Sequence, residues 1–180
     1  EHATGVFAKG RGPHWGPVST SDGHRCIDST ATVTALHLDA DNGTDWHALL
    51  DHLDSIGMAY LAHRSASHSD EKAKWHLVLP LAARLMCGRP GPDSAKQRQA
   101  VNGIWRDRVF AHAHSLFGTL AGFSDPKEDG FDPVPNHIAI ACYLGHRRTP
   151  ETPPREVRWR EGLRLDGADL AASAPAPVAH

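Results

Sequence analysis

Cysteine, long apolar runs and an excess of one charge are all scarce or missing in this chain of 180 residues. Its three cysteines lie far apart without a Cys-x-x-Cys pair, which argues against a disulfide framework or a zinc knuckle and favours a reduced, intracellular setting. No signal peptide and no apolar run long enough to span a membrane are found, so we expect a soluble protein. Because the formal net charge is only −2, any anionic partner must be held locally.

Histidine, in contrast, is abundant, with 14 residues, which makes the net charge sensitive to pH below about 7. Apolar residues make up 40% of the chain, enough for one compact α/β domain or two small modules that share a core. We expect this domain to cover residues 1–165. Residues 166–180, rich in Ala and Pro, are expected to form a linker-like tail that leads to further domains, and the start at Glu1 suggests a piece of a larger polypeptide.

Alternating apolar patterns predict an α/β order of elements. Strands are expected over Ala31–Leu38, over Met58–Ala62 and Lys74–Leu81 as an antiparallel hairpin that ends near Pro80, and over Ile138–Leu144. Helices are expected over residues 45–56 and 95–117. The buried stripe of the longer helix is expected to comprise Val101, Ile104, Trp105, Val109, His112 and Leu116. Three prolines, Pro150, Pro153 and Pro154, are expected to end the compact part.

Two carboxylates, Asp39 and Asp41, follow the first apolar strand. Residues two apart on a strand share a face, so these carboxylates stand close together and repel unless cations lie between them. Hard oxygen ligands in this arrangement suit Mg²⁺ or Mn²⁺. The alternative is that Asp41-Asn42-Gly43 is only the turn after the strand.

Two further segments carry charged or hydrogen-bonding groups beside apolar strands. Lys74 and His76 lie two apart and share a face, as a pair that grips phosphate oxygens would, although a charged sheet edge has the same pattern. Asp132 precedes the last apolar run, and Arg147 and Arg148 follow it. Asp132-Pro133 is also a common way to open a turn.

In this order and spacing, the three segments resemble the archaeo-eukaryotic primase superfamily, in particular the primase-polymerase domains of phage and plasmid replication proteins. Residues 36–41, Leu-His-Leu-Asp-Ala-Asp, match the motif of an apolar strand that ends in acid-x-acid. Lys74-Trp75-His76 matches the second motif, with Lys in place of the usual Ser, and Phe131-Asp132 matches the third. The resemblance covers roughly residues 25–148, and His137 stands where phage relatives often have an Arg.

The resemblance implies an α/β fold in which an N-terminal α/β unit packs on a C-terminal RRM-like sheet unit, with the active cleft between them. It implies template-directed nucleotidyl transfer by two Mg²⁺ or Mn²⁺ ions, with a single-stranded DNA template, dNTP or rNTP substrates, a fused or associated helicase, and a cytoplasmic location. The implied catalytic and metal-binding residues are Asp39, Asp41 and Asp132. The implied nucleotide-binding residues are Lys74, His76 and Arg147.

Three alternatives stay open. Asp125, also in a Phe-x-Asp-Pro context, competes with Asp132 for the third carboxylate. His112-Ala113-His114 matches the His-x-His of rolling-circle nicking endonucleases, but we expect it on a helix, where residues two apart diverge by about 200° and cannot share an ion. The third alternative is a non-catalytic nucleotide-binding module of a replication protein.

One basic cluster contains an aromatic residue and lies near the end of the chain. It is expected either to touch a template backbone or to form a solvated face. Its members are Arg155, Arg158, Trp159, Arg160 and Arg164.

Overall fold

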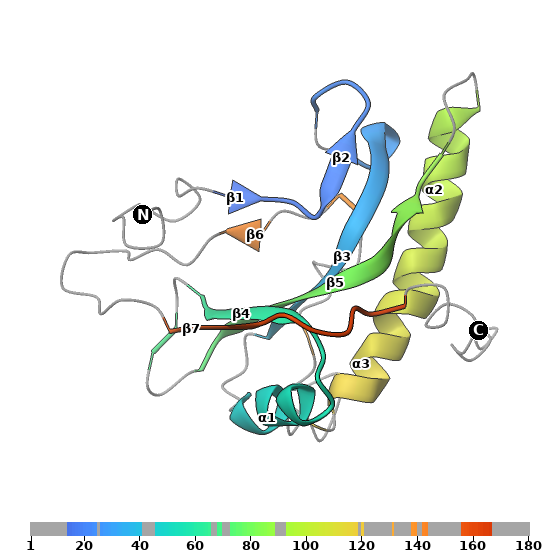
Figure 1. The fold of residues 1–180 in the computed structure, drawn as a ribbon. Coiled ribbons are helices and arrows are strands. Elements are labelled where there is room, and N and C mark those ends of the chain that lie inside the picture. Colours follow the sequence, from blue (N-terminus) through green and yellow to red (C-terminus); the bar gives the residue numbers. More distant parts are fainter. Residues whose placement is uncertain are drawn as a thin grey trace, which may run out of the picture.

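The computed structural model describes residues 14–24, 26–40, 46–65, 68–69, 73–88, 93–118, 120, 131, 138–139, 142–143 and 156–166. A five-stranded antiparallel sheet, in the order β2-β3-β5-β4-β7, is covered on one face by helices (Figure 1). Its strands are β2 (Val18–Thr20), β3 (Thr30–Ala40), β4 (Tyr60–Arg64), β5 (Trp75–Met86) and β7 (Val157–Arg160). The helices are η2 (Ile27–Ser29), α1 (His47–Ser55), α2 (Ser94–Ile104), the π-helix η3 (Trp105–Phe110) and α3 (Ala111–Gly118).

A second, two-stranded sheet pairs β1 (His14–Trp15) with β6 (Cys142–Tyr143). Of the strand predicted over Ile138–Leu144, Cys142 and Tyr143 are confirmed, the predicted start is wrong because Ile138 and Ala139 lie in a turn, and the other positions lie outside the described residues. No helix in the described part of the chain is long and apolar enough to cross a membrane.

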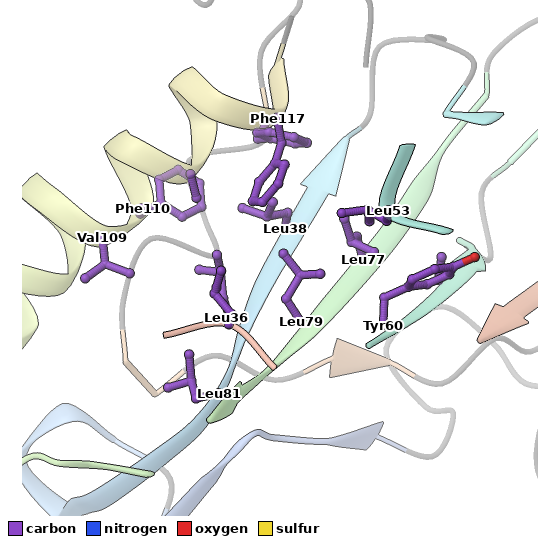
Figure 2. Close-up of a cluster of buried hydrophobic side chains, with 14 of the residues drawn as sticks. Leu36, Leu38, Leu53, Tyr60, Leu77, Leu79, Leu81, Val109, Phe110 and Phe117 are labelled. Atoms are coloured by element: carbon purple, nitrogen blue, oxygen red, sulfur yellow. The ribbon is translucent and has the colours of Figure 1, made fainter. Parts of the chain in front are cut away.

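The core lies between the helices and the two central strands. Leu36 and Leu38 of β3 and Leu77 and Leu79 of β5 are fully buried, at alternate positions as a pleated strand requires. Figure 2 shows them facing side chains of the covering helices. On the helix side of this contact lie Leu53, Val109, Phe110 and Phe117.

The predicted hairpin is confirmed, since β4 and β5 pair antiparallel, with Leu61 opposite Val78 and His63 opposite His76. The prediction that the second strand ends near Pro80 is wrong, because β5 continues to Met86. Proline cannot donate a ladder hydrogen bond and is found in sheets at edges or bulges. Here the register between β3 and β5 shifts directly after Pro80, so β5 bends at the proline instead of ending there.

The long helix is confirmed over Ser94–Gly118, but its buried stripe differs in part from the prediction. Ile104 and Leu116 are exposed, whereas Phe110, Ala113 and Phe117 are buried. After residue 110 the difference follows from the π-helix η3, whose wider turns rotate every later side chain relative to an α-helix.

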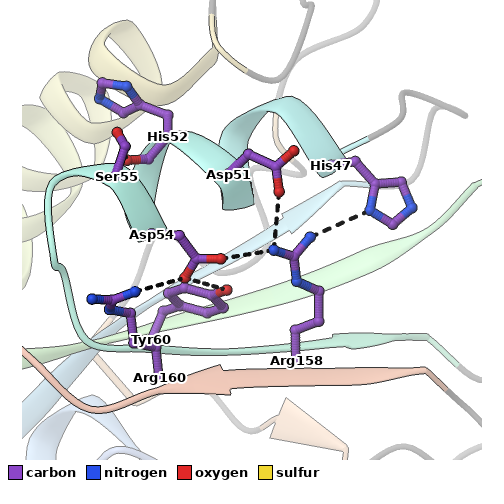
Figure 3. Close-up of polar contacts among 8 residues, drawn as sticks. All are labelled: His47, Asp51, His52, Asp54, Ser55, Tyr60, Arg158 and Arg160. Atoms are coloured by element: carbon purple, nitrogen blue, oxygen red, sulfur yellow. Dashed lines mark hydrogen bonds and ion pairs between the residues drawn. The ribbon is translucent and has the colours of Figure 1, made fainter.

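The expectation that the compact part ends at Pro154 is wrong. Strand β7 follows that proline and pairs antiparallel with β4, at the edge of the main sheet. Arg158 of β7 contacts Asp51 at 3.0 Å and Asp54 at 2.8 Å, both on α1 (Figure 3). The chain then returns along the sheet, where Leu165 N donates to Pro80 O at 2.9 Å. Segment 157–165 is thus part of the fold.

Gly162 is packed against the turn that ends α1, so we predict that Gly162→Ala destabilises the protein. A Cβ there would lie within 3.1 Å of the backbone carbon of Gly57, which itself has a φ of +71°. We expect a loss of about 1–3 kcal/mol in the free energy of unfolding, measured by urea denaturation. The matched control is Gly103→Ala on α2, where a Cβ meets nothing within 4 Å and should stabilise by about 0.5–1 kcal/mol. Equal effects at both positions would contradict the packing described for segment 157–165.

Cys87 is fully buried beside α2, and burial raises the pKa of its thiol to about 11. Only about one in a thousand of these thiols is ionised at pH 8, and the thiolate is the reactive form. We predict that iodoacetamide at pH 8 labels the exposed Cys26 but leaves Cys87 unmodified until urea unfolds the protein. Peptide mass spectrometry measures both sites, and rapid labelling of Cys87 in the native protein would show that α2 does not cover it.

Candidate functional site

The face of the sheet opposite the helices carries polar side chains where β3 ends and β5 begins. Asp39 of β3 lies directly opposite His76 of β5 in the register of the two strands. Nδ1 of His76 lies 3.5 Å from Oδ2 of Asp39, and the two side chains are 13% and 18% exposed. The structure thus brings together one residue from each of the first two predicted motifs, in a partly open position.

Two more imidazoles flank His76 and form with it the histidine cluster, defined as His37, His63 and His76. His37 precedes Asp39 by two residues on β3, and its Nε2 lies 3.1 Å from Nδ1 of His76. The ring of His63, from β4, stacks on the ring of His76 with centroids 4.9 Å apart. Three neighbouring strands therefore each contribute one imidazole to the same face.

Burial keeps two members of this cluster, His37 and His76, neutral. The side chains of His37 and His63 are 2% exposed. Burial, with a smaller electrostatic contribution from His63, lowers the pKa of His37 to about 3. Burial also lowers the pKa of His76 well below its ordinary value of 6.5, with smaller contributions from the charges of His63, His37 and Lys74. At neutral pH, His37 and His76 are hydrogen-bonding groups without charge.

Lys74 supplies the positive charge closest in sequence to His76. It precedes His76 by two residues and is half-buried, just before β5 begins. Its backbone is held from both sides: its N–H donates to Nδ1 of His68 at 3.0 Å, and its carbonyl accepts from the N–H of Ser65 at 2.8 Å. The positive charge of Lys74 makes the smallest of the contributions that lower the pKa of His76.

Several predicted site residues lie outside the described residues. They are Asp41, Asp125, Asp132, His137, Arg147, Arg148 and Arg155. Within the described ranges, no group of three or more His, Cys, Asp or Glu side chains is arranged to hold a metal ion. Asp39 is thus the one described member of the predicted carboxylate set, and its oxygens are the hard donors that Mg²⁺ prefers.

The predicted helical position of His112 and His114 is confirmed, because both lie in α3. A nicking endonuclease would need these residues side by side on a strand to bind an ion. The interpretation of this pair as a nicking motif is therefore wrong.

Two arginines of the basic cluster near the end of the chain, Arg158 and Arg160, pair with carboxylates of α1. Asp51 and Asp54 of α1 pair with Arg158, and Asp54 also lies 3.6 Å from Arg160 and accepts a hydrogen bond from Tyr60 (Figure 3). These contacts fasten β7 to α1. They leave the arginines of β7 little free charge for a nucleic acid backbone, although Trp159 is 68% exposed.

Sequence reasoning did not single out His37 or His63. The signal for His37 was present, because Leu36 and Leu38 alternate with His37 and Asp39 along β3. This alternation places His37 on the face of Asp39. No comparable signal marks His63, since the pairing of β4 with β5 decides which imidazole it meets.

Acid should destabilise the protein through His37. In the unfolded chain this residue takes up a proton below its ordinary pKa of 6.5, whereas the folded protein binds that proton only near pH 3. The stability contributed by neutral, buried His37 is present above pH 6.5 and is lost as the pH falls toward 3. We predict that His37 accounts for about 2–3 kcal/mol of the fall in unfolding free energy between pH 7 and pH 4.5.

Urea denaturation at each pH measures this effect. His37→Phe should flatten the pH dependence, whereas His52→Gln, on the exposed side of α1, serves as the control for deleting one histidine. The same acid slope in wild type and His37→Phe would contradict a buried, neutral His37.

No protein-family model and no curated protein sequence matches the chain. Among solved structures, the archaeo-eukaryotic primase (AEP) domain of the cyanophage S-2L primase-polymerase is similar, with a TM-score of 0.49 and 16% sequence identity. The similarity covers 88% of this chain and 68% of that one. At this level of similarity, the side chains of the sheet face have to carry any functional interpretation.

Proposed function

We propose that this chain is the catalytic domain of a DNA primase-polymerase that performs template-directed nucleotidyl transfer. The observation that carries the proposal is the contact between Asp39 and His76, which belong to different motifs yet lie opposite each other on adjacent strands. If Asp39 served only to form a turn, no contact with His76 of the second motif would be expected. Lys74, two residues before His76, would add a cation near this contact.

Asp39 would hold divalent metal together with Asp41 and Asp132, or with Asp125 in place of Asp132. When bound, two Mg²⁺ or Mn²⁺ ions supply Lewis acidity, lowering the pKa of the attacking 3′-hydroxyl and neutralising charge on the triphosphate. The imidazoles of the histidine cluster are poor ligands for Mg²⁺, which favours oxygen, so we assign His76 to the nucleotide instead.

Lys74 and His76 would bind the triphosphate of the incoming nucleotide. The ammonium group of Lys74 offers charge, and the neutral ring of His76 offers one directed hydrogen bond to a phosphate oxygen. Arg147 is proposed as a further phosphate ligand. The uncharged N–H of His76 would orient the triphosphate. It would bind the pyrophosphate product less tightly than a second positive charge would.

The proposed architecture and partners follow from this assignment. An N-terminal α/β unit and a C-terminal RRM-like unit within residues 1–165 would enclose the cleft, and residues 166–180 would link to further domains. The substrates would be a single-stranded DNA template and dNTP or rNTP. A fused or associated helicase would supply the template.

Primer extension tests the proposal directly. With Mg²⁺ or Mn²⁺, a primed single-stranded template and all nucleotides, we expect incorporation by the wild type and a loss of about 10²–10³-fold in Asp39→Asn. The matched control is Asp107→Asn, which removes an exposed carboxylate from η3 and should leave incorporation unchanged. His76→Ala should raise the KM for nucleotide about tenfold, through one lost hydrogen bond to a charged group.

Two results would overturn the proposal. Equal incorporation by Asp39→Asn and wild type would remove the metal role of Asp39. Metal-dependent nucleotide binding, measured by calorimetry, without incorporation on any template would favour a non-catalytic nucleotide-binding module. Comparing Asp125→Ala with Asp132→Ala identifies the third carboxylate, which should be the residue whose loss abolishes incorporation.

A further inference from the structure

The contact between His37 and His76 has a direction, because a neutral imidazole carries only one N–H. Nε2 of His37 and Nδ1 of His76 are 3.1 Å apart, so one nitrogen donates and the other accepts. If His37 donates, the proton of His76 sits on its other nitrogen, Nε2. If His76 donates, its Nε2 carries a lone pair, which would repel a phosphate.

The second nitrogen of His37 indicates which arrangement holds. Nδ1 of His37 is buried without a hydrogen-bond partner in the described part of the chain. A proton on this atom would be a buried, unsatisfied N–H, which is rarer in proteins than an unsatisfied acceptor. The proton of His37 therefore belongs on Nε2, where it has a partner, and Nδ1 of His76 is the acceptor.

Asp39 competes for Nδ1 of His76, since a carboxylate favours a proton on a facing nitrogen. Its oxygen lies 3.5 Å away, which is beyond the 2.7–2.9 Å typical of a charge-assisted hydrogen bond, whereas the two imidazole nitrogens are within hydrogen-bond distance. Positive charge bound by Asp39 would weaken this competition further. The shorter contact determines the tautomer.

The orientation of the His76 ring is also restricted by its two neighbouring rings. The ring of His37 lies at 5.3 Å and 16° to it, and the ring of His63 at 4.9 Å and 28°. These two stacked contacts come from the strands on either side of β5. Rotation of the ring would break the hydrogen bond and both contacts.

We propose that His37 is a positioning residue that holds His76 in the Nε2–H tautomer, so that His76 presents a neutral N–H to a phosphate oxygen of the incoming nucleotide. This inference rests on the proposed function for the identity of the ligand. The hydrogen bond, the buried nitrogen and the stacking that support the tautomer do not depend on it. His37 acts through His76 and touches no substrate itself.

Nuclear magnetic resonance of the ¹⁵N-labelled protein tests the tautomer without any catalysis. The imidazole nitrogen shifts of His76, assigned by their loss in His76→Gln, should report a proton on Nε2 in the wild type. In His37→Phe, which lacks the donor, the proton should move toward Nδ1 and Asp39. His37→Gln offers an amide N–H and should retain the wild-type tautomer, and His52→Gln should leave the shifts unchanged. A proton on Nδ1 of His76 in the wild type would overturn the proposal, as would an unchanged tautomer in His37→Phe.

Kinetics test the consequence for the nucleotide. His37→Phe should raise the KM for nucleotide about tenfold and change kcat by less than about twofold, with His37→Gln close to wild type. Because His37 acts through His76, the double variant His37→Phe/His76→Ala should have the KM of His76→Ala alone. Additive losses would overturn the positioning role. If even the wild type incorporates no nucleotide, the proposed function fails, while the resonance measurement still decides the tautomer.

Discussion

The pairing of β3 with β5 is the constraint on which the rest of the structure depends. Successive side chains on a strand point to opposite faces, so one register assigns both faces at once. Burial of Leu36, Leu38, Leu77 and Leu79 against the helices stabilises the protein by about 1.5–3 kcal/mol per side chain. If either strand slipped by one residue, its two leucines would turn away from the helices to the opposite face. The polar contacts of the other face are far too weak to offset that loss, so the core holds the site in place.

Because the leucine core fixes the register, the polar face can contain groups whose burial is unfavourable. Imidazoles from three strands lie side by side, and His37 and His63 are buried there although burial costs them hydrogen bonds to water. In a medium of low polarity, the remaining hydrogen bonds act more strongly than they would in water. A face of this kind suits a ligand whose own charge compensates for the lost solvation, and a metal-bound triphosphate is such a ligand.

Much of this organisation could be predicted from the sequence. Period-two alternation identified the central strands, and the same period placed Asp39, Lys74 and His76 on shared faces. The shared register that brings Asp39 to His76 could not be predicted, because it depends on pairing between distant segments. The π-helix η3 was equally hidden, since it arises from packing of the long helix rather than from a local signal such as Pro or Gly. Strand β7 was missed because the prolines before it indicated an end, whereas the α1 carboxylates that fasten Arg158 lie about a hundred residues earlier.

The late position of β7 also affects how the chain folds during synthesis. Strands β3, β4 and β5 are complete once residue 86 has been made, but β4 remains an open edge until Val157–Arg160 leaves the ribosome. At about 5–20 residues per second, this interval lasts several seconds. Throughout it, the unpaired backbone of β4, with the apolar Tyr60 and Leu61, is a template for pairing with other chains. The nascent protein therefore passes through an aggregation-prone stage that the finished domain conceals, and chaperone demand should be greatest before the last strand is added.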